Sequence, residues 1–334
     1  MTEPRTDTTR LQRMARAYAE SAVLYAALDL ELFTHIAGGA DTGSTLARAL
    51  DITPLNVERL VTACLALGLI VRDGERLVNA PDAERFLVRD RPGYAGPWMM
   101  FTRPDVPRWF ALTGLLRDKA PPTVLGKYAA LTVEEARAYH QATSSIGMGA
   151  GRRFARQVDL SGRKLLLDLG GGSGAYSIAA VNANPGLRAI VFDLPPVAEV
   201  AREFIAANGA SERVSAVAGD FTRDEFPPGA DAVVMASNLP IYDEGVIAAV
   251  IAKAHAALLP GGEMHLVGEM LDNDRLGPLD AALWGISEAL NGGGGKAHTI
   301  GQCREYFRAA GFTQVEDTPF VPGTLHRVWG VKGA

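Results

Sequence analysis

The sequence predicts an α/β protein in which a Rossmann-like doubly wound sheet follows an α-helical winged-helix module. Two segments carry this prediction. Residues 164–193 contain an apolar run, a glycine-rich turn, a helical stretch and a second apolar run, which is the order of a strand–helix–strand unit. Residues 44–81 read as a short helix, a turn, a longer helix and a hairpin, which is the order of a winged helix-turn-helix.

The N-terminal region is expected to be helical and broadly apolar. Apolar residues recur at three- and four-residue spacing over residues 11–36, which predicts one amphipathic helix there. The second helix of the winged module, residues 55–69, carries a single basic residue, Arg59. A DNA-recognition helix needs donors for phosphates and base edges, so we expect burial for this helix. The hairpin turn is placed at Asp73-Gly74.

The remainder of the chain is expected to build the sheet. Residues 92–122 are irregular and aromatic, and a helix over residues 132–158 leads into a series of alternating strands and helices. The series ends in a strand pair, which predicts an antiparallel end to a largely parallel sheet. We therefore expect three regions: residues 1–105 as the winged-helix domain, 106–160 as connecting helices that line a substrate cleft, and 161–334 as the sheet domain.

Composition limits the classes of protein that fit. The chain has 334 residues, 48% of them hydrophobic and 21% charged, with a net charge of -5, which argues against a nucleic-acid partner. The two cysteines, Cys64 and Cys303, are predicted to be buried free thiols. No export signal, membrane-spanning run or metal-ligand spacing is found. We expect a cytoplasmic location.

The glycine turn is built for a cationic nucleotide ligand. Asp168 ends the first strand two residues before the glycines, and Asp193 ends the second strand. A carboxylate at Asp168 is badly placed for a pyrophosphate and well placed for a cation. The run DLGGGSG resembles the first motif of class I S-adenosylmethionine-dependent methyltransferases.

This resemblance implies S-adenosylmethionine as the cofactor and assigns roles to several residues. Gly170 and Gly172 would give its backbone room, and Asp193 would bind the ribose hydroxyls. Asp220 and Phe221, in the GDF run, would contact the adenine. Ser237, at the end of a later strand, completes the expected cofactor set.

The landmarks of the whole chain are similar to those of the small-molecule O-methyltransferase family of plant phenylpropanoid and bacterial natural-product pathways. They are the winged-helix module and the runs DEGV, LLPGGEMHLVGEM and HTIGQCREYFRAAGF. The resemblance implies a homodimer in which the N-terminal module dimerises and roofs the active site of the partner.

The family's catalytic base is missing from the sequence. Where the family has a histidine before the DE pair, this chain has Leu239, and the second of the family's two supporting glutamates is replaced by Ala297. The first is matched by Glu269. A phenol titrates near 10 and needs a base to become a good nucleophile, whereas a thioether has no proton to lose.

We therefore expect methyl transfer by proximity and desolvation to a thioether, such as the 4-methylthio-2-hydroxybutyrate of dimethylsulfoniopropionate synthesis. Two alternatives stay open: an O- or C-methyltransferase of an aromatic natural product with a relocated base, and an inactive cofactor-binding regulator. The candidate catalytic residues are Tyr139, His140, Glu269 and His298. Arg103, Arg152 and Arg153 could hold a substrate carboxylate. The candidate substrate contacts are Trp98, Met99, Arg103 and Trp284.

Overall fold

The fold was analysed in a computed structural model, which describes residues 6–334. The chain divides into two compact units, Met1–Arg103 and Pro104–Ala334, and each is described here by itself. The domain boundaries expected at residues 105 and 160 stay predictions.

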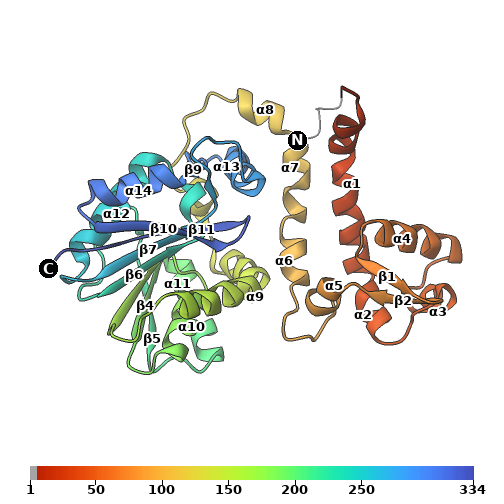
Figure 1. The fold of residues 1–334 in the computed structure, drawn as a ribbon, viewed down its shortest axis with the longest axis horizontal. Helices are drawn as coiled ribbons and strands as arrows, with labels where there is room; N and C mark the ends of the chain where they lie inside the picture. Colours follow the sequence, from red (N-terminus) through yellow and green to blue (C-terminus); the bar gives the residue numbers. More distant parts are fainter. Residues whose placement is uncertain (1–5) are drawn as a thin grey trace. The chain divides into compact units, whose positions relative to one another are not determined.

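The N-terminal unit is helical with one small hairpin (Figure 1). Its core is a single apolar cluster that includes Leu32, Phe33 and Cys64, all with no exposed surface. The elements, in chain order, are α1 (Thr9–Asp29), α2 (Leu32–Ala37), α3 (Gly43–Ala49), α4 (Pro54–Ala66), β1 (Ile70–Asp73), β2 (Arg76–Asn79), α5 (Pro81–Phe86) and α6 (Gly96–Phe101).

The prediction of a single helix over residues 11–36 is wrong. Helix α1 ends at Asp29, and Glu31 adopts a left-handed backbone with φ of 50° before α2 begins. The break turns the chain so that Leu32 and Phe33 enter the core, while Glu31 forms an ion pair with Arg89 at 2.6 Å. Burial of two large apolar side chains outweighs continued helical periodicity.

The hairpin of the winged module has its two-residue loop at Gly74-Glu75, one residue later than expected. Asp73 pairs with Arg76 as the last register position of β1 and β2. Gly74 has a φ of 61°, and a positive φ at the first loop position favours glycine. The glycine therefore opens the loop instead of closing it.

The second unit is a seven-stranded sheet with helices on both faces (Figure 1). The strand order is β10-β11-β7-β6-β3-β4-β5; β3 to β7 run parallel, and β10 and β11 are antiparallel. The strands are β3 (Leu165–Leu169), β4 (Arg188–Asp193), β5 (Val214–Ala218), β6 (Ala232–Ala236), β7 (Glu263–Gly268), β10 (Thr313–Val321) and β11 (Leu325–Val331), with a separate short pair, β8 (Met270–Leu271) and β9 (His298–Thr299). This order confirms the expected doubly wound sheet with an antiparallel end.

Alternating side chains of the interior strand β3 pack on the two faces of the sheet. Leu167 and Leu169 of β3 pack in the apolar cluster that contains residues of α12 and α14, whereas Leu166 packs in the cluster that contains residues of α9, α10 and α11. A strand buried on both faces reads as a continuous apolar run. The helices of this unit are α7 (Val106–Phe110), α8 (Leu112–Arg117), α9 (Val133–Gln157), α10 (Ala175–Ala183), α11 (Pro195–Ala207), α12 (Glu244–Ala257), α13 (Leu279–Asn291) and α14 (Ile300–Ala309).

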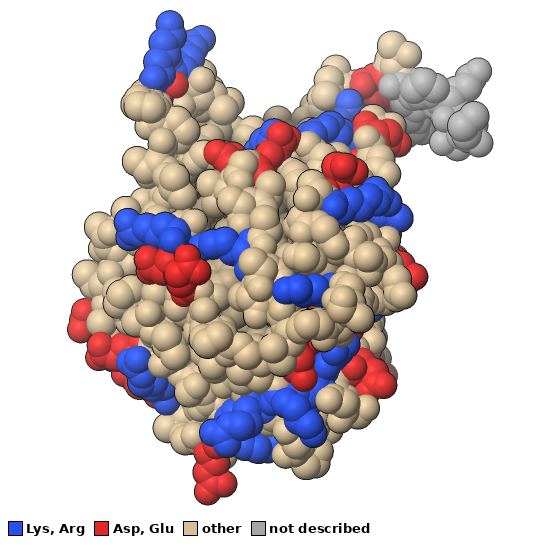
Figure 2. All heavy atoms as spheres, turned by 90° about the vertical axis from the view of Figure 1, so that its left-hand side faces the viewer, with Lys and Arg blue, Asp and Glu red and all other residues tan. Residues whose placement is uncertain are grey.

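The structure tests what the composition predicted about surface charge, cysteines and membrane-spanning helices. Over most of the face shown in Figure 2, Lys and Arg side chains are interspersed with Asp and Glu side chains. Cys64 and Cys303 are both free and buried, as predicted. Within residues 6–334, none of the helices combines the length and the apolarity needed to cross a membrane.

The exposed apolar face of helix α1 predicts that the protein self-associates. Leu11, Met14 and Tyr18 lie on one face at helical spacing and are 55%, 62% and 58% exposed in a single copy. We expect light scattering at micromolar concentration to give a mass of about twice 35.5 kDa. The double substitution Leu11→Glu, Met14→Glu should shift the protein toward monomer, because it places charges in an apolar contact. A monomeric wild-type protein at that concentration would contradict the prediction.

Candidate active site

The glycine turn between β3 and α10 approaches two side chains from distant segments. Gly170 and Gly172 have φ of 63° and 57°. A Cβ on Gly170 would lie 2.6 Å from Nδ2 of Asn238, and a Cβ on Gly172 would lie 2.6 Å from Cε1 of His140. Glycine is therefore required at both positions for its conformation and for its lack of a side chain.

Asp168, near the end of β3, is a buried carboxylate that receives uncharged donors from Ser177. It is 1% exposed, and the hydroxyl of Ser177 donates to its Oδ2 at 2.7 Å. Burial raises the pKa of Asp168 to about 7, and the charge of Asp193 adds to the shift. Burying an uncompensated charge is costly, so this site is suited to a cationic ligand.

Asp193, at the end of β4, ties the glycine turn to the next strand. The backbone N–H of Gly172 donates to its Oδ2 at 2.9 Å, and that of Leu194 donates to Oδ1 at 2.7 Å. Burial raises the pKa of Asp193 to about 6 against these two bonds. A carboxylate oxygen retains a second lone pair, and Asp193 lines the pocket described below.

The end of β5 supplies Asp220 and Phe221. The backbone N–H and the hydroxyl of Thr222 donate to Oδ1 of Asp220 at 2.9 and 2.6 Å, and Arg223 forms an ion pair with Oδ2 at 3.0 Å. The ring of Phe221 lies edge-on to that of Tyr242, with centroids 5.3 Å apart. These contacts hold both residues at the pocket wall.

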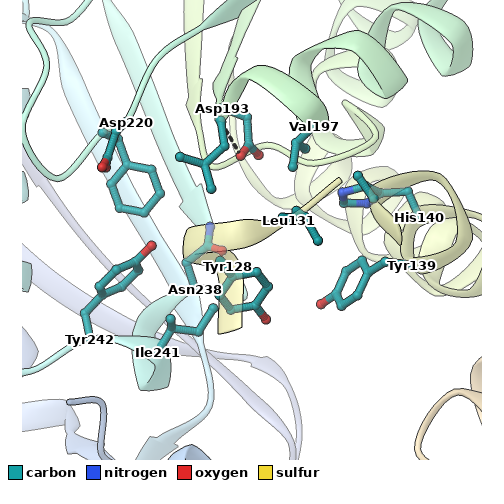
Figure 3. A pocket seen from close by; sticks show the side chains of 13 residues that line it. Tyr128, Leu131, Tyr139, His140, Asp193, Val197, Asp220, Asn238, Ile241 and Tyr242 are labelled. Atoms are coloured by element: carbon teal, nitrogen blue, oxygen red, sulfur yellow. Dashed lines mark hydrogen bonds between the residues drawn. The ribbon is translucent and has the colours of Figure 1, made fainter. Parts of the chain in front are cut away.

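One pocket gathers Asp193, Asp220 and Phe221 with an aromatic wall (Figure 3), whereas Asp168 and the glycines of the turn are not among its lining residues. It contains about 610 Å³ of space, part of it open to solvent. It lies at the carboxyl ends of β4, β5 and β6, where the strand order reverses around β3, and ligands bind at such a switch point in open α/β sheets. Its lining consists of Tyr128, Leu131, Ala136, Tyr139, His140, Asp193, Leu194, Val197, Asp220, Phe221, Asn238, Ile241 and Tyr242.

Helix α9 brings Tyr139 and His140 into this pocket. Burial raises the pKa of Tyr139 to about 12, against a hydrogen bond from Tyr128 that lowers it. Burial lowers the pKa of His140 to about 4, so the imidazole is neutral at physiological pH. The hydroxyls of Tyr128 and Tyr139 lie on the same side of the pocket (Figure 3).

Three polar residues of the pocket were missed by sequence reasoning. Tyr128 precedes α9 in a short 3₁₀ turn, and Asn238 and Tyr242 flank the position of the family's base. Asn238 donates to the backbone oxygen of Gly170 at 3.1 Å. A polar residue just after a parallel strand is a signal that could have found Asn238; nothing in the sequence around Tyr128 singles it out.

Leu239, at the position of the family's missing base, packs in the core. Leu239 has no exposed surface, and a Cβ on Gly268 would lie 3.1 Å from the Cβ of Leu239. Ala297 lies against Gly285, where an added Cβ would be 2.6 Å from that of Ala297. Neither residue lines the pocket. Burial raises the pKa of the remaining glutamate, Glu269, to about 7, and its charge acts on Tyr139.

His298 is held away from the pocket by two hydrogen bonds. Its Nδ1 lies 3.0 Å from the hydroxyl of Tyr306, and its Nε2 lies 2.9 Å from the backbone oxygen of Tyr242. The side chain has no exposed surface. Both ring nitrogens are thus engaged, and this histidine supports Tyr242 from behind. Ser237, exposed and with φ of 60°, also stays outside the lining.

The expected substrate contacts lie in three settings. Trp98 stacks on Phe101 with centroids 5.6 Å apart, and Met99 packs on the core of the N-terminal unit. Arg103 forms an ion pair with Asp29 at 2.6 Å. Trp284 is half-buried on α13. Their contact with a substrate stays a prediction.

Comparison with known proteins gives the chain a family. The model of the O-methyltransferase domain matches residues 125–313, and that of the O-methyltransferase dimerisation domain matches residues 12–89. The chain is 33% identical to the 3-hydroxy-5-methyl-1-naphthoate 3-O-methyltransferase of Streptomyces sahachiroi, over 97% of this chain and 95% of that protein. It is 31% identical to the tetracenomycin polyketide synthesis 8-O-methyl transferase TcmO of Streptomyces glaucescens, over 92% and 91%.

A solved structure shares the fold. Human N-acetylserotonin methyltransferase in complex with S-adenosylmethionine superposes with a TM-score of 0.82 over the whole of both chains, at 23% identity. The cofactor is S-adenosylmethionine. The buried carboxylates Asp168 and Asp193 suit a cationic donor and a ribose, and their contact with the cofactor stays a prediction.

Loss of Asp193 should weaken cofactor binding. We expect Asp193→Ala to reduce the affinity for S-adenosylmethionine by about 1.5 to 3 kcal/mol, the range for a hydrogen bond to a charged group. Isothermal calorimetry measures the change, and Glu212→Ala, at an exposed carboxylate, serves as the control. Equal affinities of wild type and Asp193→Ala would refute the assignment.

The affinity for the cofactor should also depend on pH. The pKa values of Asp168 and Asp193, raised to about 7 and about 6, mean that both carboxylates are ionised only above that range. A cationic ligand prefers the ionised forms, so affinity should fall as pH is lowered from 8 to 5. Asp168→Asn should flatten the upper part of this profile. An affinity that rises on acidification would contradict the prediction.

Proposed function

Because the chain belongs to the O-methyltransferase family, we propose that it methylates a hydroxyl group of an aromatic natural product. The supporting observation is one pocket in which the cofactor carboxylates Asp193 and Asp220 face the aromatic residues Tyr128, Tyr139 and Tyr242. The relatives named above act on a hydroxynaphthoate and in tetracenomycin polyketide synthesis. Both are named for O-methylation, and neither supports the thioether acceptor expected from the sequence.

The pocket residues orient the reaction. When bound, S-adenosylmethionine supplies an activated methyl group, whose bond to sulfur breaks as the acceptor oxygen attacks. Asp193 of the pocket and the buried Asp168 would hold the donor, and the tyrosines of the pocket would confine a flat acceptor. Alignment of two reactants can supply about 7 to 11 kcal/mol of the barrier. The acceptor's proton must then pass to a protein group.

Glu269 is the group best matched to receive that proton. A phenol titrates near 10, and the pKa of His140, lowered to about 4 by burial, makes proton transfer to it uphill by about 8 kcal/mol. The pKa of Glu269, raised by burial to about 7, reduces this to about 4 kcal/mol. Glu269 is not among the lining residues, but its charge acts on Tyr139, which is one of them. In this proposal the proton therefore passes to Glu269 through the hydroxyl of Tyr139.

The burial of Leu239 favours a second candidate acceptor, a thioether. The apolar residue at the position of the family's base is buried and outside the pocket, and a thioether such as 4-methylthio-2-hydroxybutyrate needs no base. The two candidates differ in their dependence on Glu269. The dimerisation-domain match to residues 12–89 supports the further proposal that the enzyme works as a homodimer.

The pH profile of kcat separates the candidates. With a naphthol at saturating S-adenosylmethionine, kcat should rise as pH passes through about 7, because the raised pKa of Glu269 leaves it ionised only above that value. Glu269→Gln should lower kcat by about 10²- to 10⁴-fold. Glu316→Gln, at an exposed carboxylate, is the control.

A thioether acceptor gives the opposite pattern. Its kcat should be flat over the same pH range and unchanged in Glu269→Gln. Methylation of thioethers, with no turnover of any naphthol or phenol, would sink the proposal of O-methylation.

Restoring the family residue provides a separate check. Leu239→His should not raise the rate with a naphthol, because Leu239 faces the core and has no exposed surface. A polar ring buried there should instead lower the stability by about 1 to 3 kcal/mol. A gain in kcat with a new pKa near that of histidine would show that position 239 reaches the acceptor.

A further inference from the structure

One amide in the wall of the pocket has its nitrogen fully engaged by the backbone. Asn238 follows β6 and lines the pocket. Its Nδ2 donates to the backbone oxygens of Ala236 and Gly170 at 3.0 and 3.1 Å, and the backbone oxygen of Leu169 lies 3.4 Å away. These three oxygens fix which atom of the amide is the nitrogen, because the flipped amide would place oxygen against oxygen.

The oxygen of the same amide, Oδ1, is an unused acceptor. Within residues 6–334, no hydrogen bond ends on Oδ1 of Asn238. It is also absent from the buried polar atoms of this range that lack a partner. The oxygen is therefore accessible, and it belongs to a residue of the pocket wall.

Local structure does not account for this oxygen. Asn238 is the N-cap of the 3₁₀ turn Leu239–Ile241, and an asparagine oxygen at an N-cap usually accepts a backbone N–H. Here the side chain makes no capping bond. The atoms closest to a Cβ on Gly170 would be Nδ2 of Asn238 at 2.6 Å, Cε1 of Phe221 at 2.9 Å and Cγ of Asn238 at 3.1 Å. The amide thus presents its nitrogen to the glycine turn and turns its oxygen away from it.

Asn238 stands between the two parts of the pocket (Figure 3). Asp193 and Asp220 lie on one side of it, and Tyr128 and Tyr139 lie on the other. The glycine turn on which its nitrogen packs is the segment expected to accommodate the methyl donor. The free oxygen therefore belongs to the region where the expected donor side of the pocket meets the acceptor side.

A neutral amide oxygen can hold a donor group but cannot take its proton. A phenol held by this oxygen would keep its proton and stay a poor nucleophile. An aromatic amine differs, because its nitrogen carries a lone pair in addition to its N–H bonds and is uncharged at neutral pH. With one N–H on Oδ1 of Asn238, that lone pair remains free to attack without a base at Leu239.

We propose that the enzyme also methylates the amino group of an aromatic amine, which Asn238 orients through Oδ1. The nitrogen lone pair forms the bond to the methyl carbon while the bond from that carbon to sulfur breaks, and the electron pair of the broken bond stays on the sulfur of S-adenosylhomocysteine. The nitrogen becomes positively charged, which strengthens its hydrogen bond to Oδ1 in the transition state. It then releases one proton to water through the part of the pocket that is open to solvent. This activity goes beyond the O-methylation proposed above and does not depend on Glu269.

Three matched naphthalenes that differ in the nucleophilic atom test the proposal: 1-aminonaphthalene, 1-naphthol and 1-(methylthio)naphthalene. With the wild-type enzyme at saturating S-adenosylmethionine, mass spectrometry should show N-methylated 1-aminonaphthalene. Methylation of 1-naphthol without any N-methylated product would overturn the inference and leave O-methylation standing. Methylation of the amine alone would support the inference and remove O-methylation. Turnover of the thioether alone would remove both.

Two variants of Asn238 separate the role of Oδ1 from that of Nδ2. At saturating cofactor, Asn238→Leu should lower kcat for the amine by about 10- to 100-fold, as expected for a lost hydrogen bond to a group that becomes charged. The naphthol should be affected much less, because its proton leaves through Tyr139. Asn238→Asp loses the amide nitrogen but keeps an acceptor oxygen, so it should retain most of the amine activity. Asn208→Leu, at an exposed asparagine after α11, is the control.

A structural role of Asn238 alone would give a different pattern. Both variants lose the bonds of Nδ2 to the backbone, so equal losses of amine activity in the two would contradict the proposal. Equal losses for the amine and the naphthol in Asn238→Leu would contradict it as well. If Asn238→Leu is unstable by its melting temperature, Asn238→Ala removes the same oxygen and repeats the test.

Binding provides a readout without turnover. Calorimetry against the protein saturated with S-adenosylhomocysteine should show that 1-aminonaphthalene binds more weakly to Asn238→Leu than to the wild type or to Asn238→Asp. Equal affinity of the amine for the wild type and Asn238→Leu, or no binding of the amine to the wild type, would refute the contact with Oδ1.

Discussion

The bond from the backbone N–H of Gly172 to the carboxylate of Asp193, at 2.9 Å, is the interaction on which the site depends. It joins the glycine turn to the neighbouring strand and fixes the left-handed backbone of Gly172. The imidazole of His140 then packs where a side chain would otherwise stand. This hydrogen bond thus links the glycine turn to Asp193 at the point where His140 of α9 packs on the turn.

The site contains buried carboxylates whose ionised forms are unfavourable until a cationic ligand binds. The pKa values of Asp168, Asp193 and Glu269 are all raised by burial, to about 7, 6 and 7. Clusters of perturbed groups of this kind are typical of functional sites. A cationic donor lowers the cost of ionising Asp168 and Asp193. The pKa of Glu269 stays near 7, where a carboxylate is most useful as a proton acceptor.

The replacement of the family's base is a change of packing as well as of chemistry. Leu239 fills the space beside Gly268 and belongs to the same apolar cluster as Leu169 and Met235. The pocket receives Tyr128 from the turn before α9 and Tyr139 and His140 from α9 itself. Tyr128 and Tyr139 lie across the pocket from Asp193 and Asp220 (Figure 3).

The sequence by itself determined the strand–turn–helix unit, a doubly wound sheet with an antiparallel end and the carboxylates at Asp168 and Asp193, because these follow from patterns of neighbouring residues. The loss of a base at Leu239 followed from comparison with the family's motif. It misplaced the end of the first helix, since burial of Leu32 and Phe33 overrides local periodicity. Only the tertiary structure decided that His298 is tied to Tyr306 and to the backbone of Tyr242. Likewise, only folding brings Tyr128, Tyr139 and Asn238 together from three segments, because such contacts leave no periodic signal in the sequence.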